Sequence, residues 1–181
     1  SRGISAFIVD AGTPGLDDSA HIPVMAPHPL ATLTFERCRV SGEQMLGDVN
    51  GGFKLAMQTL DIFRASVAAA ALGMARRALA EAIQHAKGRR MFGQTLADFQ
   101  LTQAKLGEMA ALIDGAALLT YRAAWMRDTG QGSLKERSVA AAMAKMTATE
   151  NAQRVIDMAP RKHGGLGVRG GSRGGSPYRA T

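Results

Sequence analysis

The stretch that decides the fold is Gly51–Gln103, GGFKLAMQTLDIFRASVAAAALGMARRALAEAIQHAKGRRMFGQTLADFQLTQ. It predicts a long alanine-rich helix over about 53–87, then a basic turn at 89–93, then the opening of a second helix. Apolar residues in its first part recur at the three-, four- and seven-residue spacing of a buried helical stripe. These residues are Leu60, Val67, Ala71, Met74 and Ala78.

Two polar clusters interrupt this apolar pattern. Asp61 and Arg64 lie near the start of the expected helix, and Arg89 and Arg90 lie at its end. A helical pair with a purely structural role would need neither cluster. We therefore expect this stretch to carry the function of the chain.

The composition indicates a soluble globular protein. The chain has 181 residues, of which 46% are hydrophobic, and this suffices for one good core. Its single cysteine, Cys38, excludes an internal disulfide and favours a reducing, cytoplasmic setting. Neither a run of about 18 apolar residues nor a signal peptide is apparent, so we expect no membrane association.

The net charge of +7 raises the alternative of nucleic-acid binding. Most of that charge belongs to the last 21 residues, which hold five basic side chains and no acidic one. The segment 168–181 is rich in Gly, Ser and Arg, which predicts a disordered tail. Two R-G-G units without an aromatic between them are weak support for RNA binding, so we predict no nucleic-acid partner.

Residues 1–50 read as β structure. Strands are expected at Ile4–Val9 and Leu30–Val40, with a turn-rich loop at Asp10–Asp18 and a short extended piece at His21–Met25. Three strands cannot close a barrel or complete a sandwich. This section is therefore interpreted as the end of a larger β domain.

Two further helices follow the first one. The second is expected over 96–127, with a capping box at Thr95 and Asp98 and a stop at Gly130. Its seam is formed by Phe99, Leu106, Met109, Ile113, Ala117 and Thr120. The third opens with the capping box Ser133…Glu136 and ends at Gly164-Gly165. Its stripe is formed by Val139, Met143, Met146 and Val155.

The fold class predicted from these elements is mainly α. A partial β domain (1–50) precedes an up-down helical bundle (51–167) and the tail (168–181). Three long faces this rich in alanine and methionine are hard to bury in one short chain, so self-association is expected.

The ordered motifs resemble those of the acyl-CoA dehydrogenases over nearly all of residues 3–167. The motifs are LGDVNGGF at 46–53, LDIFR at 60–64, R-x-M-F-G at 89–93, FQ at 99–100, YRAAW at 121–125 and GGLG at 164–167. The resemblance implies that the chain is the C-terminal half of such an enzyme, with the last strands of its middle β domain and most of its C-terminal helical bundle.

The resemblance also implies roles for seven residues. Arg89 matches an arginine that reaches the FAD pyrophosphate of a neighbouring subunit, where a guanidinium offers a fork of donors to phosphate oxygens. Further positions around the same cofactor match Phe92, Gln100, Gly164 and Gly165. Asp61 and Arg64 match a D-x-x-R motif that meets the CoA part of the substrate. The plainer alternatives are a surface ion pair for Asp61 and Arg64 and a helix C-cap for the two glycines.

Two departures from the family pattern concern the catalytic base. Most members supply a glutamate from a segment beyond GGxG, and nothing matching it is found here. A smaller group supplies it directly before the arginine of D-x-x-R, where this chain has Phe63. Glu81 and Glu108 are explained as residues of solvated helix faces. Arg161 stands where the family usually has a flavin-contacting glutamine.

The activity implied by the resemblance is FAD-dependent oxidation of an acyl-CoA to the trans-2-enoyl-CoA. Its electrons would pass to an acceptor such as an electron-transfer flavoprotein, and the helical domain would form a homodimer or homotetramer. Because it lacks both known bases, the chain is expected to be a fragment that is inactive alone. The alternatives are a non-catalytic oligomerisation module and a related oxidase or monooxygenase.

Overall fold

The computed structural model describes residues 3–24 and 29–163, with side chains as far as residue 159. The chain divides into two compact units, Ser1–Leu60 and Asp61–Thr181, and each is described by itself. Gly164, Gly165 and the expected tail at 168–181 lie outside the described residues, and so does the side chain of Arg161.

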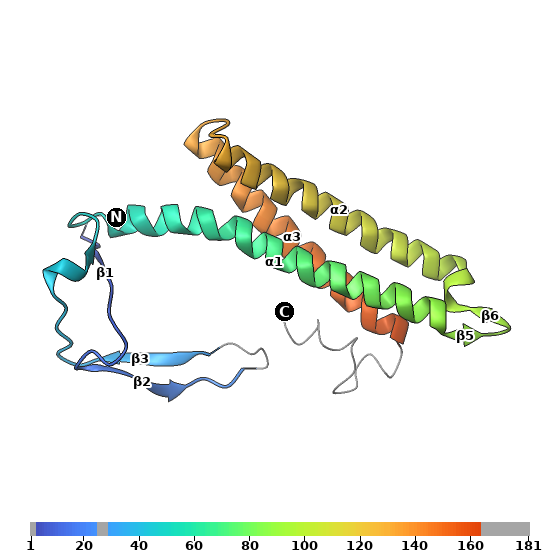
Figure 1. The fold of residues 1–181 in the computed structure, drawn as a ribbon, viewed down its shortest axis with the longest axis horizontal. Helices are drawn as coiled ribbons and strands as arrows, with labels where there is room; N and C mark the ends of the chain where they lie inside the picture. The colour runs from blue at the N-terminus through green and yellow to red at the C-terminus, as the bar shows by residue number, and fades with distance from the viewer. Residues whose placement is uncertain (1–2, 25–28, 164–181) are drawn as a thin grey trace. The chain divides into compact units, whose positions relative to one another are not determined.

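The first unit contains two small antiparallel sheets (Figure 1). Strand β1 (Ala6–Phe7) pairs with β4 (Met45–Leu46), and β2 (Leu16–His21) pairs with β3 (Ala31–Phe35). A short 3-10 turn, η1 (Gly42–Gln44), precedes β4. Strands β1 and β3 are shorter than predicted, and β2 ends where the extended piece at 21–25 was expected to begin. Strand β4 was not expected, because two residues cannot show an alternating pattern.

One boundary in this unit was predicted wrongly. Asp17 and Asp18 were assigned to a loop, but both lie in β2, where Asp17 pairs with Thr34. The strand is exposed along nearly its whole length, so its carboxylates stay in water and pairing costs them no desolvation.

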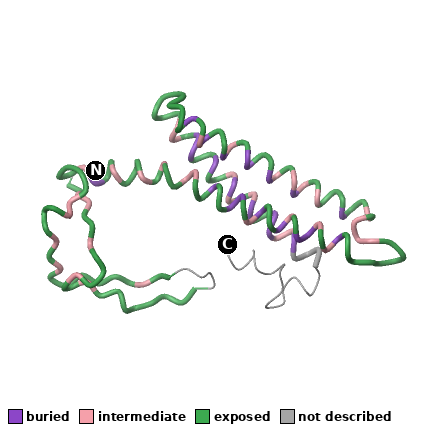
Figure 2. Tube along the Cα trace, in the orientation of Figure 1, coloured by how far each residue is buried: buried purple, intermediate pink, exposed green. Residues whose placement is uncertain are grey.

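The first unit buries little apolar surface. Within the described residues, every buried hydrophobic side chain lies at Ala68 or later. Leu33 and Phe35 of β3 are each 55% exposed, and Figure 2 shows the β segments in green and pink. Hydrogen bonds therefore do more than apolar packing to hold these strands.

The first helix, α1 (Gly52–Gly88), begins and ends within one residue of its predicted limits. Its start is fixed by Gly52, whose amide donates a 2.9 Å hydrogen bond to the Ile4 carbonyl. A Cβ at this position would lie 2.8 Å from the Ser5 carbonyl carbon. Only glycine allows the helix to begin so close to the neighbouring backbone.

The second helix starts later than predicted. Residues Leu96–Asp98 form a separate 3-10 turn, η2, and α2 (Gln100–Asp128) follows after Phe99, whose ψ of 129° is extended. The capping box at Thr95 is confirmed, with its amide 2.7 Å from Asp98 Oδ2, but it caps the 3-10 turn. Gly130, with a φ of 69°, follows the end of α2 as expected.

The third helix, α3 (Leu134–His163), opens with the predicted capping box. Ser133 donates from its amide to Glu136 Oε2 at 2.7 Å, and the Glu136 amide donates back to Ser133 Oγ at 3.3 Å. Arg137 fixes the preceding turn by donating to the Gly130 and Gly132 carbonyls at 2.8 and 2.9 Å.

Alanine makes most of the core of the second unit. The buried stripe of α1 has three- and four-residue spacing and runs through Ala68, Ala71, Leu72, Ala75, Ala78 and Ala82. It packs with Met109, Ile113, Ala116 and Ala117 of α2 and with Ala144, Ala148, Ala152, Val155 and Ile156 of α3. Small side chains let helices approach closely, so the alanines mark the contact faces.

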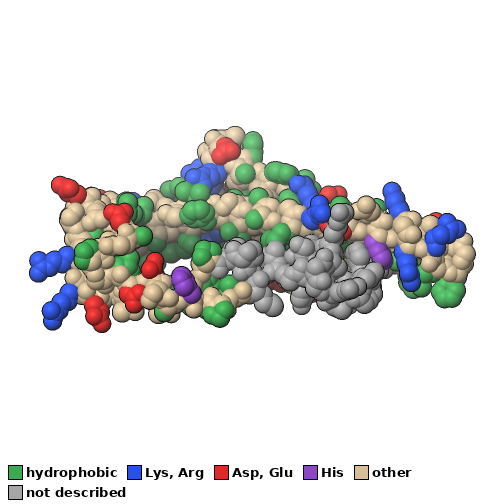
Figure 3. All heavy atoms as spheres, turned by 60° about the horizontal axis from the view of Figure 1, so that its bottom comes forward, with side chains coloured by type: hydrophobic (Ala, Val, Ile, Leu, Met, Phe, Trp, Pro, Cys, Tyr) green, Lys and Arg blue, Asp and Glu red, His purple; other side chains and the backbone are tan. Residues whose placement is uncertain are grey.

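Several positions predicted to lie in the buried stripes of α1 and α3 are exposed instead. Leu60 and Val67 of α1 are each 44% exposed, and Met146 of α3 is 61% exposed. Val139 and Met143 are exposed as well. The larger side chains were read as core, yet they lie outside the close alanine contacts. Figure 3 shows hydrophobic side chains, in green, reaching the surface along the helices.

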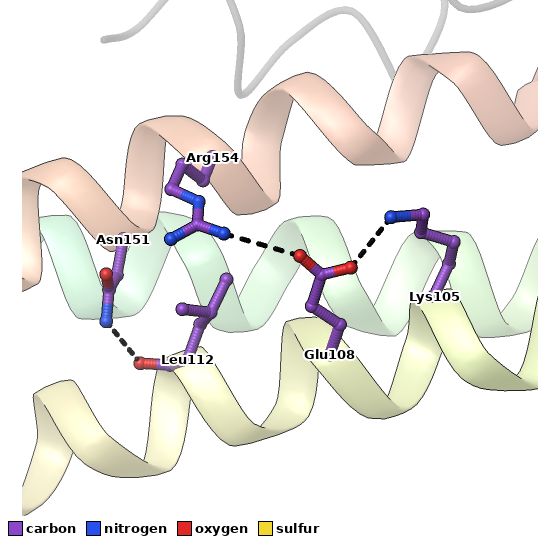
Figure 4. Close-up of polar contacts among 5 residues, drawn as sticks. All are labelled: Lys105, Glu108, Leu112, Asn151 and Arg154. Atoms are coloured by element: carbon purple, nitrogen blue, oxygen red, sulfur yellow. Dashed lines mark hydrogen bonds and ion pairs between the residues drawn. The ribbon is translucent and has the colours of Figure 1, made fainter.

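Polar contacts join α2 and α3 at their rims (Figure 4). Asn151 Nδ2 of α3 donates to the Leu112 carbonyl of α2 at 2.9 Å. Glu108 of α2 accepts from Lys105 at 2.8 Å and from Arg154 of α3 at 3.4 Å. These contacts fix the register of the antiparallel pair.

One helix satisfies the length and composition criteria for a membrane span. Within the described residues this is α1, with an 18-residue window of mean hydropathy 1.3. The core helix of a bundle meets the same criteria, and α1 also carries the ion pairs Asp61–Arg64 and Arg77–Glu81.

Candidate functional site

The D-x-x-R pair of α1 forms a contact that includes a second helix. Arg64 Nη1 forms an ion pair and hydrogen bond with Asp61 Oδ1. The same oxygen accepts a hydrogen bond from Ser138 Oγ of α3 at 3.0 Å. Asp61 is thus held from two sides, by a residue one turn away and by one 77 positions later in the chain.

The geometry goes beyond a plain surface ion pair. The side chains of Arg64 and Asp61 are 35% and 37% exposed, so the pair lies at the edge of the bundle. A guanidinium carries five N–H donors, and the carboxylate engages only Nη1. The other donors of Arg64 can bind an anion that approaches from solvent.

The basic turn after α1 is a tight β-hairpin. Strand β5 (Arg90–Met91) pairs with β6 (Gln94–Thr95), and Phe92 and Gly93 form the two-residue turn with φ values of 50° and 82°. Turns of this kind favour Asn-Gly or Gly-Gly, because both central residues have positive φ. A bulky side chain at such a position is an outlier, and backbone strain of this kind gathers at functional sites. Phe92 is also 89% exposed at the tip of the hairpin.

The two arginines of this turn are placed differently. Arg90 donates from Nη2 to the Gly93 carbonyl at 3.3 Å and thereby braces the hairpin. The main chain of Arg89 connects two elements, since its amide donates to the His85 carbonyl at 2.9 Å and its carbonyl accepts from Leu96 at 2.7 Å. Its side chain is exposed. Arg89 therefore combines a fixed backbone with a guanidinium that can contact another molecule.

The structure brings together some of the expected residues and separates others. Arg89 and Phe92 share the hairpin region, and Gln100 is the exposed first residue of α2, just after η2. Asp61 and Arg64 lie near the other end of α1. At 1.5 Å per residue, Arg64 and Arg89 are roughly 37 Å apart along the helix. The two clusters therefore form separate candidate sites.

Glu81 was predicted wrongly to lie on a solvated helix face. Its side chain is 10% exposed, and Oε1 is paired with Arg77 at 2.6–2.7 Å. Its Oε2 is buried without a hydrogen-bond partner among the described residues. The alanine-rich face of α1 carries Glu81 into the bundle with Ala78, because helical neighbours three positions apart share a face.

Glu108 lies on a partly exposed face of α2, in line with the helix face predicted for it. Hydrogen bonding from Lys105, followed by the charges of Lys105 and Arg154, lowers the pKa of its carboxyl group. Such stabilisation of the ionised form suits an ion-pair partner and is the opposite of what a general base at neutral pH requires.

Ser138 was missed by sequence reasoning, since nothing local signals a contact with residue 61.

A metal site or a groove would be another place where the expected site residues could act. Among residues 3–24 and 29–163, no group of three His, Cys, Asp or Glu side chains could hold a metal ion. A groove of about 400 Å³ lies between the end of α2 and the start of α3. Its lining includes Arg122, Met126, Lys135 and Met143, and it contains none of the seven expected site residues.

The matches to known proteins agree with these motifs. Residues 50–181 match the family model of the acyl-CoA dehydrogenase C-terminal domain. The chain belongs to the acyl-CoA dehydrogenase family. Members of this family are oxidoreductases and FAD-dependent flavoproteins.

Individual relatives are similar over almost the whole chain. The human mitochondrial short-chain specific acyl-CoA dehydrogenase is 41% identical over 92% of this chain and 40% of its own length. The CarC subunit of a caffeyl-CoA reductase–Etf complex from Acetobacterium woodii is 40% identical over 92% of this chain and 44% of its own. Butyryl-CoA dehydrogenase from Megasphaera elsdenii superposes with a TM-score of 0.92 at 38% identity, over 99% of this chain and 46% of that one. The chain thus spans less than half the length of the relatives it matches.

Proposed function

We propose that this chain is the C-terminal part of a flavin-dependent acyl-CoA dehydrogenase. The complete enzyme would convert an acyl-CoA to the trans-2-enoyl-CoA. A bound flavin supplies the acceptor for the β-hydride in this reaction. The residues of this chain would bind and position the cofactor and the CoA part of the substrate.

The observation that carries the proposal is the hairpin at the end of α1. Phe92 is strained, aromatic and almost fully exposed at the tip of the hairpin, and Arg89, also exposed, lies three residues earlier in the chain. A guanidinium fits a pyrophosphate, and an aromatic ring can pack against a planar or apolar group of the same cofactor. This donor set suits FAD that belongs mainly to another subunit, because the hairpin presents these groups outward. Gln100 would contribute from the start of α2, and Gly164 and Gly165 are proposed from the resemblance alone.

Arg64 is the proposed contact for the CoA part of the substrate. CoA is polyanionic, and Arg64 keeps donors that Asp61 does not engage. The distance along α1 between Arg64 and Arg89 supports two separate roles. Asp61 would orient Arg64 and would not act as the base.

Flavin binding tests the cofactor proposal directly. We expect the purified chain to quench the fluorescence of added FAD, and Arg89→Ala to weaken this binding about tenfold through loss of a charge-assisted contact. Lys87→Ala is the matched control, because it removes one exposed positive charge near the same end of α1 and should have little effect. If Arg89→Ala and Lys87→Ala bind FAD as tightly as the parent chain, the cofactor role of Arg89 is wrong. A chain that binds no FAD would favour the non-catalytic oligomerisation module.

We further propose that the chain alone does not turn over acyl-CoA. Removal of the α-proton needs a carboxylate within hydrogen-bond reach of that carbon. One position that the family uses for the base is occupied by Phe63, which is 56% exposed. FAD-dependent bleaching of an acceptor dye by the chain with butyryl-CoA would contradict this proposal.

The proposed partners follow from exposed surface and from one relative. Leu118, Tyr121 and Trp125 of α2 are 54–73% exposed and recur at helical spacing, which supports a homodimer or homotetramer through the helical unit. The name of the CarC relative supports an electron-transfer flavoprotein as the acceptor. We propose that α1 packs in the bundle and does not span a membrane. We also propose that the protein acts in the cytoplasm and binds neither nucleic acid nor a membrane.

A further inference from the structure

The contact between Ser138 and Asp61 connects the start of α3 to the D-x-x-R pair of α1. Ser138 Oγ lies 3.0 Å from Asp61 Oδ1, and this oxygen also receives Arg64 Nη1. Serine hydroxyls inside helices commonly bond to the carbonyl of the preceding turn. Ser138 instead donates across to another helix.

The position of Ser138 is itself well fixed. It lies five residues after Ser133, whose capping box with Glu136 begins α3. The adjacent Arg137 holds the preceding turn through the Gly130 and Gly132 carbonyls. The hydroxyl of Ser138 therefore comes from a part of the helix whose start is held by two sets of hydrogen bonds, those of the capping box and those of Arg137. Because the helix start is fixed, the Ser138 hydroxyl can hold the Asp61 carboxylate in one orientation and does not move with it.

We propose that Ser138 is a positioning residue for recognition of the CoA part of the substrate. Its hydroxyl holds the Asp61 carboxylate in the orientation that engages Arg64 Nη1. The remaining guanidinium donors are thereby directed to the anionic ligand. Ser138 touches Asp61 and acts on the ligand through Arg64. This inference rests on the proposed CoA role of Arg64 and adds a residue of α3 to it.

Hydrogen bonding makes the effect of each substitution predictable. Without the Ser138 hydroxyl, Asp61 Oδ1 loses one of its two donors, and the pair can adopt other rotamers. Ligand binding would then have to order the Arg64 side chain again, and the conformational entropy lost would weaken the affinity. We expect Ser138→Ala to weaken binding of CoA, titrated calorimetrically into the full chain at fixed ionic strength, by about threefold to tenfold. Ser138→Thr keeps a hydroxyl and should restore most of the affinity.

A double-substitution cycle separates positioning from a general loss of structure. In an Arg64→Ala background, Ser138→Ala should leave CoA affinity unchanged, because the residue through which it acts is gone. A merely structural role would weaken binding equally in both backgrounds. Thr149→Val is the matched control on α3, since the Thr149 hydroxyl bonds within its own helix to the Lys145 carbonyl. It should not alter CoA binding.

The outcomes distinguish this inference from the function on which it rests. If Arg64→Ala does not weaken CoA binding, or the parent chain does not bind CoA, the proposed CoA site is wrong and Ser138 has no such role. If Arg64→Ala weakens binding but Ser138→Ala does not, the CoA site stands and the positioning role of Ser138 is wrong. Equal effects of Ser138→Ala in both backgrounds would also overturn it.

Discussion

The two units of this chain differ in how far they bury their apolar side chains. The helical unit buries alanines, Met109, Val155 and Ile156 almost completely. The β segments before it leave Phe7, Ile8, Leu33 and Phe35 about half exposed. Hydrophobic content alone therefore does not make a core. A core requires elements long enough to bring apolar faces together, and strands of two to six residues do not provide this.

The largest expected effect contrasts one apolar residue from each unit. Met109→Ala removes a side chain with no exposed surface and should lower the free energy of unfolding by about 2–5 kcal/mol. Leu33→Ala, at a position 55% exposed, should change it by less than about 0.5 kcal/mol. Urea denaturation followed by circular dichroism measures both. Comparable losses in the two variants would show that β3 is packed as firmly as the bundle.

The next prediction concerns the buried carboxylate of the helical unit. Arg77→Ala removes the partner of Glu81 and should destabilise the bundle by about 1 kcal/mol, a modest value because the Arg77 side chain is 65% exposed and screened by water. Glu81→Gln removes the buried charge. In that background Arg77→Ala should have little further effect on the urea midpoint. An undiminished loss there would mean that Arg77 contributes through packing alone.

In contrast to these losses, a substitution in the hairpin of β5 and β6 should stabilise the protein. Phe92→Asn places a residue suited to positive φ in the turn, and it removes a side chain that is 89% exposed. We expect the free energy of unfolding to rise by roughly 0.5 kcal/mol, since part of the strain is relieved. Phe92→Leu keeps the strain and should give no gain. Stability should rise in Phe92→Asn while FAD affinity falls, and a fall in both would argue against strain at this position.

The smallest effect is the pH dependence of the α3 cap. Hydrogen bonds from the Ser133 backbone, and then from its side chain, lower the pKa of Glu136 from its ordinary value of 4.5. Because the pKa is lowered in the folded state, the cap stabilises the protein above the unfolded pKa. This contribution is lost as the pH falls from about 4.5 through the lower folded value. Thermal melts from pH 6 to pH 3 should show a smaller pH-dependent decrease for Glu136→Gln. Parallel curves for the two proteins would exclude this role.

The sequence predicted the helical elements well because their signals are local. The limits of α1 were within one residue, and the Ser133…Glu136 cap and the Gly130 stop were confirmed. The mainly α bundle and the family were confirmed by the matching domain model and by the solved relative. In the β segments the limits were less accurate, since short exposed strands carry little periodicity.

The candidate site was predictable only in part. The sequence motifs named Asp61, Arg64, Arg89 and Phe92, and the described structure gives each a definite setting. The cofactor and substrate roles of all seven site residues stay predictions. Ser138 could not be found from sequence, because its contact with Asp61 joins positions 77 apart.

The sequence by itself determined the helices, their caps and the family, because capping, turn and motif signals act over a few neighbouring residues. The sequence also predicted the buried seam of α2, where Met109, Ile113 and Ala117 are buried. Only the tertiary structure decided the full buried faces of α1 and α3. It placed alanines inside and many larger side chains outside, since close helix approach rewards small residues at the contact. It also placed Glu81 in the bundle and directed Ser138 to Asp61, because both depend on how separate helices meet.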